Sequence, residues 1–383
     1  MFFASLALAC LQAPEAPPPA AATPSRAALI ADAVQQLVAM QEDGEWPYEG
    51  VYRVKGEIPV GYHVGGTSIV ATTLLHAAPK DEAVLEAIAL ALDSVSKNLA
   101  HPLMEPSTVD AYDVRVWGHA YALAFLCELR AAKALGSREA DATAWIGKLL
   151  ATLATEEIPG GGWNYANRKQ PATFVTAPVI QALLLARSQG EKIPDELFER
   201  GRDVLLRGRH GDGAFVYSGG SKEPGGLGMS GEVFASLAGA SGRSAACEST
   251  LFLLGASSLD KVRGAALNFF DHWDDLEARR KKTGTHEGPY RIAPYYFYYA
   301  HAYTAQSIEL LPSKARDELR ARMLETLLKT RDADGTWDDR VFPRTRNYGT
   351  SMAVLALLLD KAPMPPAWSS SKDKKTPQGP AGK

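Results

Sequence analysis

The sequence predicts an all-α fold in which six helical hairpins close into two concentric rings, an (α/α)6 toroid. Two observations support this prediction. A turn of one kind recurs along the 383 residues, each time with a large aromatic residue, at positions 46, 163, 215 and 337. Between the turns, amphipathic helical segments alternate with more uniformly apolar ones. Two rings require this alternation, because an outer helix shows one face to water and an inner helix is covered almost all round.

The turn is clearest at Gln41–Trp46 and Asp332–Trp337, and degenerate forms stand at Gly160–Trp163 and Asp212–Phe215. Its Asp-Gly step suits a chain reversal, because glycine adopts positive φ at little cost. The gaps between successive aromatic residues are 117, 52 and 122 residues. These gaps are near two, one and two units of a period of about 50 to 60 residues, which indicates a repeat fold. Two unmarked turns are therefore expected near residues 105 and 276.

Helical periodicity fills each unit of the repeat. The expected outer helices are 25–41, 81–100, 138–156, 194–208, 258–277 and 313–331, and the expected inner helices are 65–78, 112–135, 172–188, 241–256, 294–311 and 347–361. Ser25, Ser258 and Ser313 are candidate N-caps, and Pro194 lies near a helix start. The fourth unit is the least regular, and residues 225–240 could form a loop, a strand or an additional helix.

The turn resembles that of the terpenoid-cyclase and protein-prenyltransferase repeat family, which includes squalene-hopene-cyclase-like proteins and whose turn runs Gln…Asp-Gly-x-Trp. The matching residues are Gln41, Asp43, Gly44 and Trp46 in one turn, and Asp334, Gly335 and Trp337 in the other. The resemblance extends over about residues 25–361. It implies the toroid and a central cavity for a hydrophobic or isoprenoid ligand, but it does not fix the chemistry, because one fold serves many functions.

The sequence lacks the motifs of the known toroid reactions. No Asp-x-Asp-Asp acid is present, and Asp271–Asp275 has the wrong spacing on an expected outer helix. Neither Cys127 nor Cys247 follows an aspartate at the spacing of the prenyltransferase zinc site, and Asp338-Asp339 lacks the third carboxylate of a magnesium motif. A thioester sequence is also absent. No metal and no cofactor are therefore predicted, and the two cysteines are expected to be small buried side chains.

Three residues are candidate catalytic groups. Glu248 lies inside an otherwise apolar inner helix, where desolvation would raise its pKa toward the range of a general acid unless a partner such as Arg243 compensates. Asp113 leads into the second inner helix, and His286 precedes the fifth. We expect these side chains at the mouth of the toroid, where the long loops and the inner-helix N-termini converge.

The candidate substrate-binding residues are mostly aromatic or basic. The segment Pro294–His301 holds five aromatic residues in a row, which cannot all face one side of a helix, so some are expected to line the cavity and others to pack between the rings. Aromatic faces can stabilise a carbocation or stack on a sugar ring. The full set is His63, Tyr112, Trp163, Tyr295, Tyr296, His301, Arg344, Arg346 and Tyr348.

Composition limits the partners and the location. With 41 Lys and Arg against 44 Asp and Glu, the formal charge of −3 gives no whole-surface attraction to nucleic acid. No segment has the 18 or more apolar residues that span a bilayer. Residues 1–24 resemble a signal segment with a Pro/Ala linker, which favours export over a cytoplasmic location although no basic residue precedes the apolar stretch. The toroid domain is expected at 25–362 and a disordered tail at 363–383.

Three functions stay open from the sequence. The first is a terpene-cyclase-like isomerase or lyase with a noncanonical acid. The second is a non-catalytic, secreted binding or scaffold toroid, which would take a protein partner. The third is a carbohydrate-active lyase or hydrolase acting on an acidic glycan. A deep aromatic cavity would favour the first, a centre filled by side chains the second, and an open cleft with two carboxylates about 5–10 Å apart the third.

Overall fold

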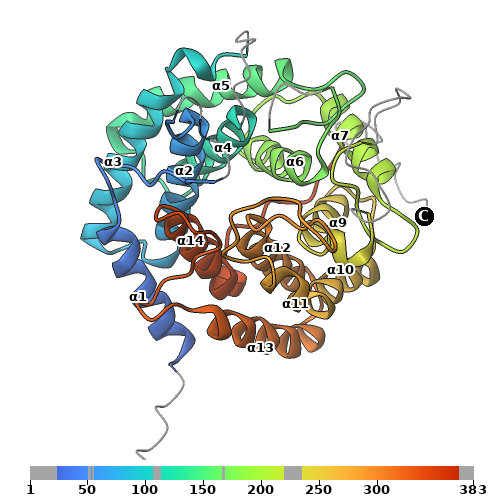
Figure 1. Ribbon diagram of the computed structural model, residues 1–383. Coiled ribbons are helices and arrows are strands. Elements are labelled where there is room, and N and C mark those ends of the chain that lie inside the picture. The colour runs from blue at the N-terminus through green and yellow to red at the C-terminus, as the bar shows by residue number, and fades with distance from the viewer. Residues whose placement is uncertain are drawn as a thin grey trace, which may run out of the picture.

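The structure is a computed structural model that describes residues 24–50, 53, 56–106, 114–165, 169–219 and 235–370. Its helices form two concentric rings, which Figure 1 shows along the ring axis. The outer ring holds α1 (Arg26–Ala39), α3 (Glu82–Leu99), α5 (Glu139–Thr155), α7 (Asp195–Gly208), α10 (Leu259–Asp271) and α13 (Ser313–Thr330). The inner ring holds α2 (Val60–Ala77), α4 (Arg115–Ala131), α6 (Thr173–Ser188), α9 (Ser244–Leu253), α12 (Tyr296–Leu310) and α14 (Thr345–Leu358). The predicted (α/α)6 toroid is confirmed.

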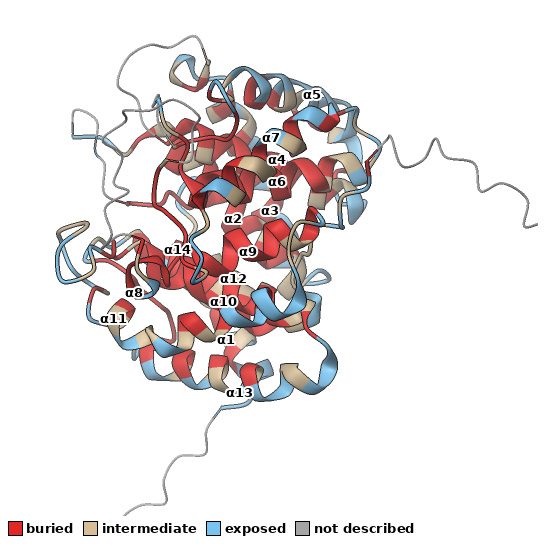
Figure 2. Cartoon of the chain, turned by 90° about the vertical axis from the view of Figure 1, so that its right-hand side faces the viewer, coloured by how far each residue is buried: buried red, intermediate tan, exposed pale blue. Residues whose placement is uncertain are grey.

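The inner ring closes on itself. Each inner helix packs on the next, and α14 packs on α2, so the last hairpin meets the first. Figure 2 shows the inner helices buried along most of their length and the outer helices with an exposed outer face. Among the described residues, the longest apolar helices still fall short of what crossing a membrane requires.

Most helix ends follow local sequence signals. Ser25 and Ser258 accept hydrogen bonds from the backbone N–H groups of Ala28 and Lys261, as their N-cap prediction requires. The expectation for Ser313 is wrong, because Pro312 takes the cap position and Ser313 is the first residue of α13. Proline fixes the extended entry there, since its φ is −58° and its ψ is 147°.

Short elements occupy the irregular units. They are η1 (Pro102–Met104), η2 (Gly136–Arg138), α8 (Leu237–Ala240), α11 (Trp273–Glu277) and η3 (Leu359–Lys361). The fifth outer helix, expected to be continuous over 258–277, breaks at His272 into α10 and α11. Within the ambiguous stretch 225–240, residues 235–240 contain α8 as an additional short helix, and residues 225–234 lie outside the described part of the chain.

The recurring turn joins the two rings through its tryptophan. In three turns the indole Nε1–H donates to a carbonyl of the outer helix before it, over 2.7–2.8 Å. In the same turns the tryptophan backbone N–H donates to a threonine hydroxyl on the inner helix after it, over 2.9–3.0 Å. The three sets are Leu37, Trp46 and Thr67; Leu153, Trp163 and Thr176; and Leu327, Trp337 and Thr350. Each tryptophan is fully buried, so these bonds fix the spacing of outer helix, turn and inner helix.

Two of these threonines follow a glycine that the close packing requires. A Cβ at Gly66 would lie 2.5 Å from the backbone oxygen of Trp46, and one at Gly349 would lie 2.4 Å from that of Trp337. Both distances are shorter than any normal contact. The Gly-Thr pair therefore lets the inner helix pass against the turn while the threonine bonds to it.

The chain after α14 crosses the end of the toroid. Residues 362–370, here called the C-terminal strap, run from η3 toward the fourth hairpin. The backbone N–H of Trp368 donates to Leu253 O at the end of α9, and its ring lies 6.0 Å from that of Phe198 on α7. Composition places the disordered tail from residue 363, but the prolines Pro363, Pro365 and Pro366 limit the freedom of this stretch and Trp368 anchors it.

The threonine bond can be tested by removing the hydroxyl alone. We expect Thr176→Val to lower the free energy of unfolding by about 1–3 kcal/mol, because the buried Trp163 N–H would lose its acceptor in a side chain of nearly the same shape. Thr155→Val, at an exposed position on α5, is the matched control and should stay within about 0.5 kcal/mol. Urea denaturation of both variants measures the difference. Equal stability of the two would show that the turn does not depend on this bond.

Candidate functional site

A cavity opens at the N-terminal ends of the inner helices, at the mouth of the toroid. It measures about 60 Å³ and is called the mouth cavity below. Five inner helices or the turns before them supply its lining, and nine of its ten described lining residues are aromatic. They are Tyr48, Tyr62, Val114, Trp117, Tyr165, Phe174, Tyr295, Tyr296, Tyr299 and Tyr348. The sequence-predicted residues that the structure brings together here are Tyr295, Tyr296 and Tyr348.

The aromatic rings form two continuous walls. On one side, Tyr48 packs on Tyr348 at 4.4 Å and on Tyr62 at 5.2 Å, and Tyr62 continues to Trp117 at 5.6 Å. On the other side, Phe174 packs edge-on against Tyr296 at 5.2 Å. Three of these contacts are edge-to-face, the geometry that aromatic quadrupoles favour, and the Tyr48–Tyr348 pair is tilted. The mouth cavity is therefore a preformed pocket of π faces.

The aromatic run of α12 divides between the two surfaces of the helix. Tyr295, Tyr296 and Tyr299 face the mouth cavity. Phe297 instead packs against Trp273 of α11, and the Tyr298 hydroxyl donates to Thr330 O at the end of α13. Both uses that the sequence left open for this run thus occur, one on each side of the helix.

The rim of the mouth cavity carries a chain of hydrogen bonds. The hydroxyls of Tyr217 and Tyr295 lie 3.3 Å apart, and that of Tyr295 lies 3.1 Å from His286 Nε2. His286 Nδ1 lies 3.0 Å from Arg291 O, which makes Nδ1 the protonated nitrogen of the neutral ring. Burial lowers the pKa of His286, so this histidine is neutral at pH 7 and sits at the rim rather than in the cavity.

A buried carboxyl group lies behind the lining. Asp339 is fully buried, and neither of its carboxylate oxygens receives a hydrogen bond from the part of the chain that the structure describes. Burial, and next the neighbouring Asp338, raise the pKa of Asp339 well above its ordinary value. Burial and then the Asp339 carboxylate raise the pKa of Tyr48, which places this carboxyl group within electrostatic reach of a lining phenol. Asp339 is therefore a buried carboxyl group beside the mouth cavity whose environment favours the protonated form.

The repeat itself explains where Asp339 lies. It is the second residue after the turn aromatic Trp337, and the same position in the other three turns holds a tyrosine: Tyr48, Tyr165 and Tyr217. Two of those tyrosines line the mouth cavity and the third packs on Phe174 at 5.0 Å. The last turn thus directs a carboxyl group to the side on which the others place a phenol. Considered only as an incomplete magnesium motif, Asp338-Asp339 does not reveal the role of Asp339. Aligning the sequences of the four turns would have revealed that Asp339 stands where the other turns have a tyrosine.

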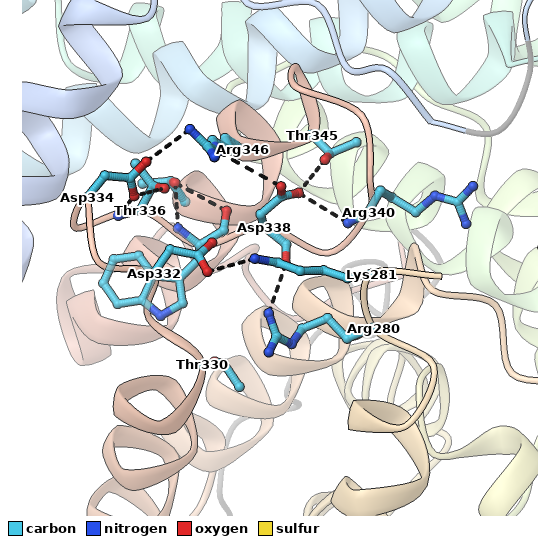
Figure 3. Close-up of polar contacts among 12 residues, drawn as sticks. Arg280, Lys281, Thr330, Asp332, Asp334, Thr336, Asp338, Arg340, Thr345 and Arg346 are labelled. Atoms are coloured by element: carbon cyan, nitrogen blue, oxygen red, sulfur yellow. Dashed lines mark hydrogen bonds and ion pairs between the residues drawn. The ribbon is translucent and has the colours of Figure 1, made fainter. Parts of the chain in front are cut away.

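Asp338 has a different environment from its neighbour. Its carboxylate accepts hydrogen bonds from the Arg340 backbone N–H at 3.1 Å and from the Thr345 hydroxyl. Figure 3 shows Arg346 reaching from α14 toward both Asp334 and Asp338, at 3.0 and 3.9 Å, while the Arg340 side chain points away from this group. Arg346, predicted to bind substrate, is thus engaged by acidic side chains of the last turn.

Several predicted site residues lie outside the mouth cavity. Glu248 is buried, but its carboxylate bonds Arg209 at 2.8 Å and the Ser257 hydroxyl, on the side of α9 that faces α7 and α10. The expectation that Glu248 faces the mouth is wrong, because helix periodicity predicts burial but not which neighbours cover a residue. Its ion partner is Arg209 and not Arg243.

His63, His301 and Trp163 serve the packing between the rings. His63 Nδ1 lies 2.9 Å from Glu45, which also bonds Ser94 and Asn98 of α3. His301 is fully buried; its Nδ1–H donates to Phe297 O, its Nε2 accepts from the indole of Trp273, and burial lowers its pKa to about 3. Trp163 is the buried turn tryptophan described above. None of the three reaches the mouth cavity.

Of the remaining predicted residues, Arg344 is half-buried and bonds Glu42 through two nitrogens. Asp113 and Tyr112 lie outside the described residues. Cys127 and Cys247 are buried free thiols, and burial raises the pKa of each to about 12, which agrees with the prediction of small buried side chains. Within the described ranges, no three His, Cys, Asp or Glu side chains gather closely enough to hold a metal ion.

Comparison with known proteins identifies the fold. No family model matches the chain, and no curated protein matches its sequence. One similar solved structure is the α-1,6-mannanase GH76A of Salegentibacter sp. HEL1_6, in complex with α-1,6-mannotetrose. It is an inactive variant in which two consecutive aspartates are changed to alanine. The TM-score is 0.57 at 10% sequence identity, and the match covers 88% of this chain and 99% of the mannanase. Similar solved structures also include the type II terpene cyclase MstE of Scytonema with geranylgeranyl dihydroxybenzoate (TM-score 0.52, 16% identity, 88% and 97%), and the Lin0763 protein of Listeria innocua (TM-score 0.56, 14% identity, 88% and 97%). At these identities the likeness shows a shared α/α toroid.

The raised pKa of Asp339 has a measurable consequence for stability. A carboxyl group whose folded-state pKa is raised contributes stability below its unfolded pKa, near 3.8, and loses it as pH rises through the folded pKa. Asp339→Asn cannot titrate, so we expect its free energy of unfolding to gain on the wild type by up to about 1.4 kcal/mol per pH unit above pH 4.

Urea denaturation at pH 4, 5, 6 and 7 measures this difference. Asp317→Asn, at a side chain that is 87% exposed, is the control and should run parallel to the wild type. If Asp339→Asn also runs parallel to the wild type, Asp339 is not held neutral by the fold.

Proposed function

We propose that the chain binds a hydrophobic, isoprenoid-like small molecule in the mouth cavity and acts on it as a terpene-cyclase-like isomerase or lyase. The observation that carries this proposal is the combination of an aromatic pocket with a buried, unpartnered carboxyl group beside it. Aromatic faces bind apolar chains and stabilise cationic carbon, and a neutral acid can supply the proton that creates it.

The proposed chemistry balances without a co-reactant. Asp339 gives its proton to one carbon of an alkene, and the π electrons of the alkene form the new C–H bond and leave a carbocation on the neighbouring carbon. The rings of Tyr48 and Tyr348 line the cavity, within electrostatic reach of Asp339, and would stabilise that cation. Loss of a proton from an adjacent carbon back to the carboxylate restores the acid and yields an isomerised or cyclised product.

The size of the cavity restricts how the ligand lies. A space of about 60 Å³ holds only a few carbon atoms of the reacting end. A longer chain must extend past the side chains at its border that are only partly buried, Trp117, Tyr165 and Tyr295. Among the lining residues that the structure describes, none is charged, which suits a neutral reacting group.

A carbohydrate ligand is the second candidate, favoured by one specific observation. The similar mannanase loses activity when two consecutive aspartates are changed, and this chain carries the consecutive pair Asp338-Asp339 in a buried position. Aromatic rings also stack on sugars. Against it, Asp338 is occupied by Thr345 and the backbone of Arg340, so only one carboxyl group of the pair is available.

Ligand-dependent thermal unfolding separates these candidates. We expect saturable stabilisation by geranylgeraniol or geranylgeranyl dihydroxybenzoate and none by α-1,6-mannotetraose, because binding to the folded state alone raises the melting temperature. Tyr296→Ala should weaken binding at least about tenfold, or roughly 1.4 kcal/mol, because it removes one wall. Tyr296→Phe keeps the ring and is the matched control.

The catalytic part of the proposal is tested with Asp339→Asn. This variant should bind the same ligand within about threefold of the wild type, roughly 0.7 kcal/mol, and form no product. Stabilisation by mannotetraose alone would favour the carbohydrate reading. Binding of neither class would leave the non-catalytic scaffold reading, with a protein partner still to be found.

A further inference from the structure

A second cavity lies on the ring axis at the opposite end of the toroid from the mouth. It measures about 130 Å³ and is called the axial cavity below. The middle and C-terminal parts of α4, α6 and α12 supply small side chains to it, among them Ala124, Ala182 and Ala302. The C-terminal strap supplies residues 362–365. Side chains this small leave the axis hollow where larger ones would fill it.

A polar partition separates the two cavities. The hydroxyls of Tyr121 and Tyr303 lie 3.3 Å apart across the axis, and the Tyr303 ring lies 4.5 Å from that of Tyr299, which lines the mouth cavity. Beside them, the side-chain amides of Gln181 and Gln306 bond each other in both directions at 2.9 Å. These polar groups satisfy one another, so an occupant of the axial cavity needs no hydrogen-bonding group of its own.

The charges around the axial cavity exclude an anionic occupant. Its lining contains no Lys, Arg or His among the described residues, and its two carboxylates already have partners. Glu128 lies 2.9 Å from His76 Nε2, and Glu309 bonds Arg320 through two nitrogens. A diphosphate or a fatty-acid carboxylate would find no cation here, whereas a neutral apolar molecule would meet alanine, leucine and methionine side chains.

We propose that the axial cavity is a second binding site, for a small neutral hydrocarbon, with the C-terminal strap as its lid. An apolar cavity of roughly this volume holds a molecule about the size of benzene. The lid is anchored beyond the cavity by Trp368 on Leu253 and by the Ser370 hydroxyl, which donates to Asp195 at 3.2 Å. The strap covers part of the cavity, so lifting it would widen the path for entry and release. This site is independent of the ligand and the reaction proposed for the mouth cavity.

Fluorine NMR of the full chain with hexafluorobenzene tests the site directly. We expect one saturable bound signal in the wild type. Ala124→Leu and Ala302→Leu, each filling the axial cavity from a different helix, should weaken binding at least tenfold; two variants are used so that misfolding of one does not decide the result. Both alanines are only partly buried because they face the cavity, so the added methyl groups have room.

Three controls make the outcome decisive. Tyr296→Ala alters the mouth cavity and Ala83→Leu adds the same side chain at an exposed position, and both should leave hexafluorobenzene binding within twofold. Trp368→Ala should release the strap and speed exchange of the probe at least fivefold. Absence of a saturable signal, unchanged binding in both cavity-filling variants, or loss of binding in Tyr296→Ala alone would each overturn the proposal.

Discussion

The hydrogen bond from each turn tryptophan to a threonine of the following inner helix is the constraint on which the rest of the toroid depends. In the hairpins of Trp46, Trp163 and Trp337, this bond fixes the position of the inner helix relative to the turn before it. Because the indole is tied at the same time to the outer helix, the two rings cannot slide past each other without breaking buried bonds. The residue two positions after each aromatic is thereby held at the mouth, so the packing device also positions the candidate site.

The fold could be predicted because its signals are local and repeated. Apolar periodicity of about 3.6 residues and the Asp-Gly turns located the outer and inner helices to within a few residues in most units. Prediction failed where the same local sequence pattern is compatible with two different structures. His272 breaks the fifth outer helix although the apolar pattern continues through it, and the Pro-rich strap is ordered because Trp368 finds a partner ring on α7, about 170 residues earlier in the chain.

The candidate site was less predictable because direction, unlike burial, depends on neighbours distant in sequence. The apolar context of Glu248 correctly indicated a buried carboxylate. Packing, however, decides whether an inner-helix residue faces the axis or the outer ring. Glu248 faces the outer ring and bonds Arg209, the C-cap residue of α7. The same holds for His301, which Trp273 holds between the rings. Tyr295, Tyr296 and Tyr348 were predictable because residues at inner-helix N-termini can face only a few directions in a closed ring.

The two consecutive aspartates show how one turn produces two different acids. Asp338 lies in the turn before α14. Its carboxylate accepts hydrogen bonds from the Thr345 hydroxyl and the Arg340 backbone N–H, which partly offset the cost of its burial. A hydrogen bond to a charged group contributes about 1.5–3 kcal/mol, whereas removing a charge from water costs several. Asp339 is buried without such hydrogen bonds among the described residues, so the cost of desolvating its carboxylate raises its pKa well above the ordinary value. Burial raises the pKa of both carboxyl groups, and the hydrogen bonds to Asp338 oppose that rise, whereas Asp339 receives none from the part of the chain that the structure describes. The position of Asp339, where the other turns carry tyrosines, therefore places a titratable group in an otherwise structural repeat, and the proposed function assigns it the proton to transfer.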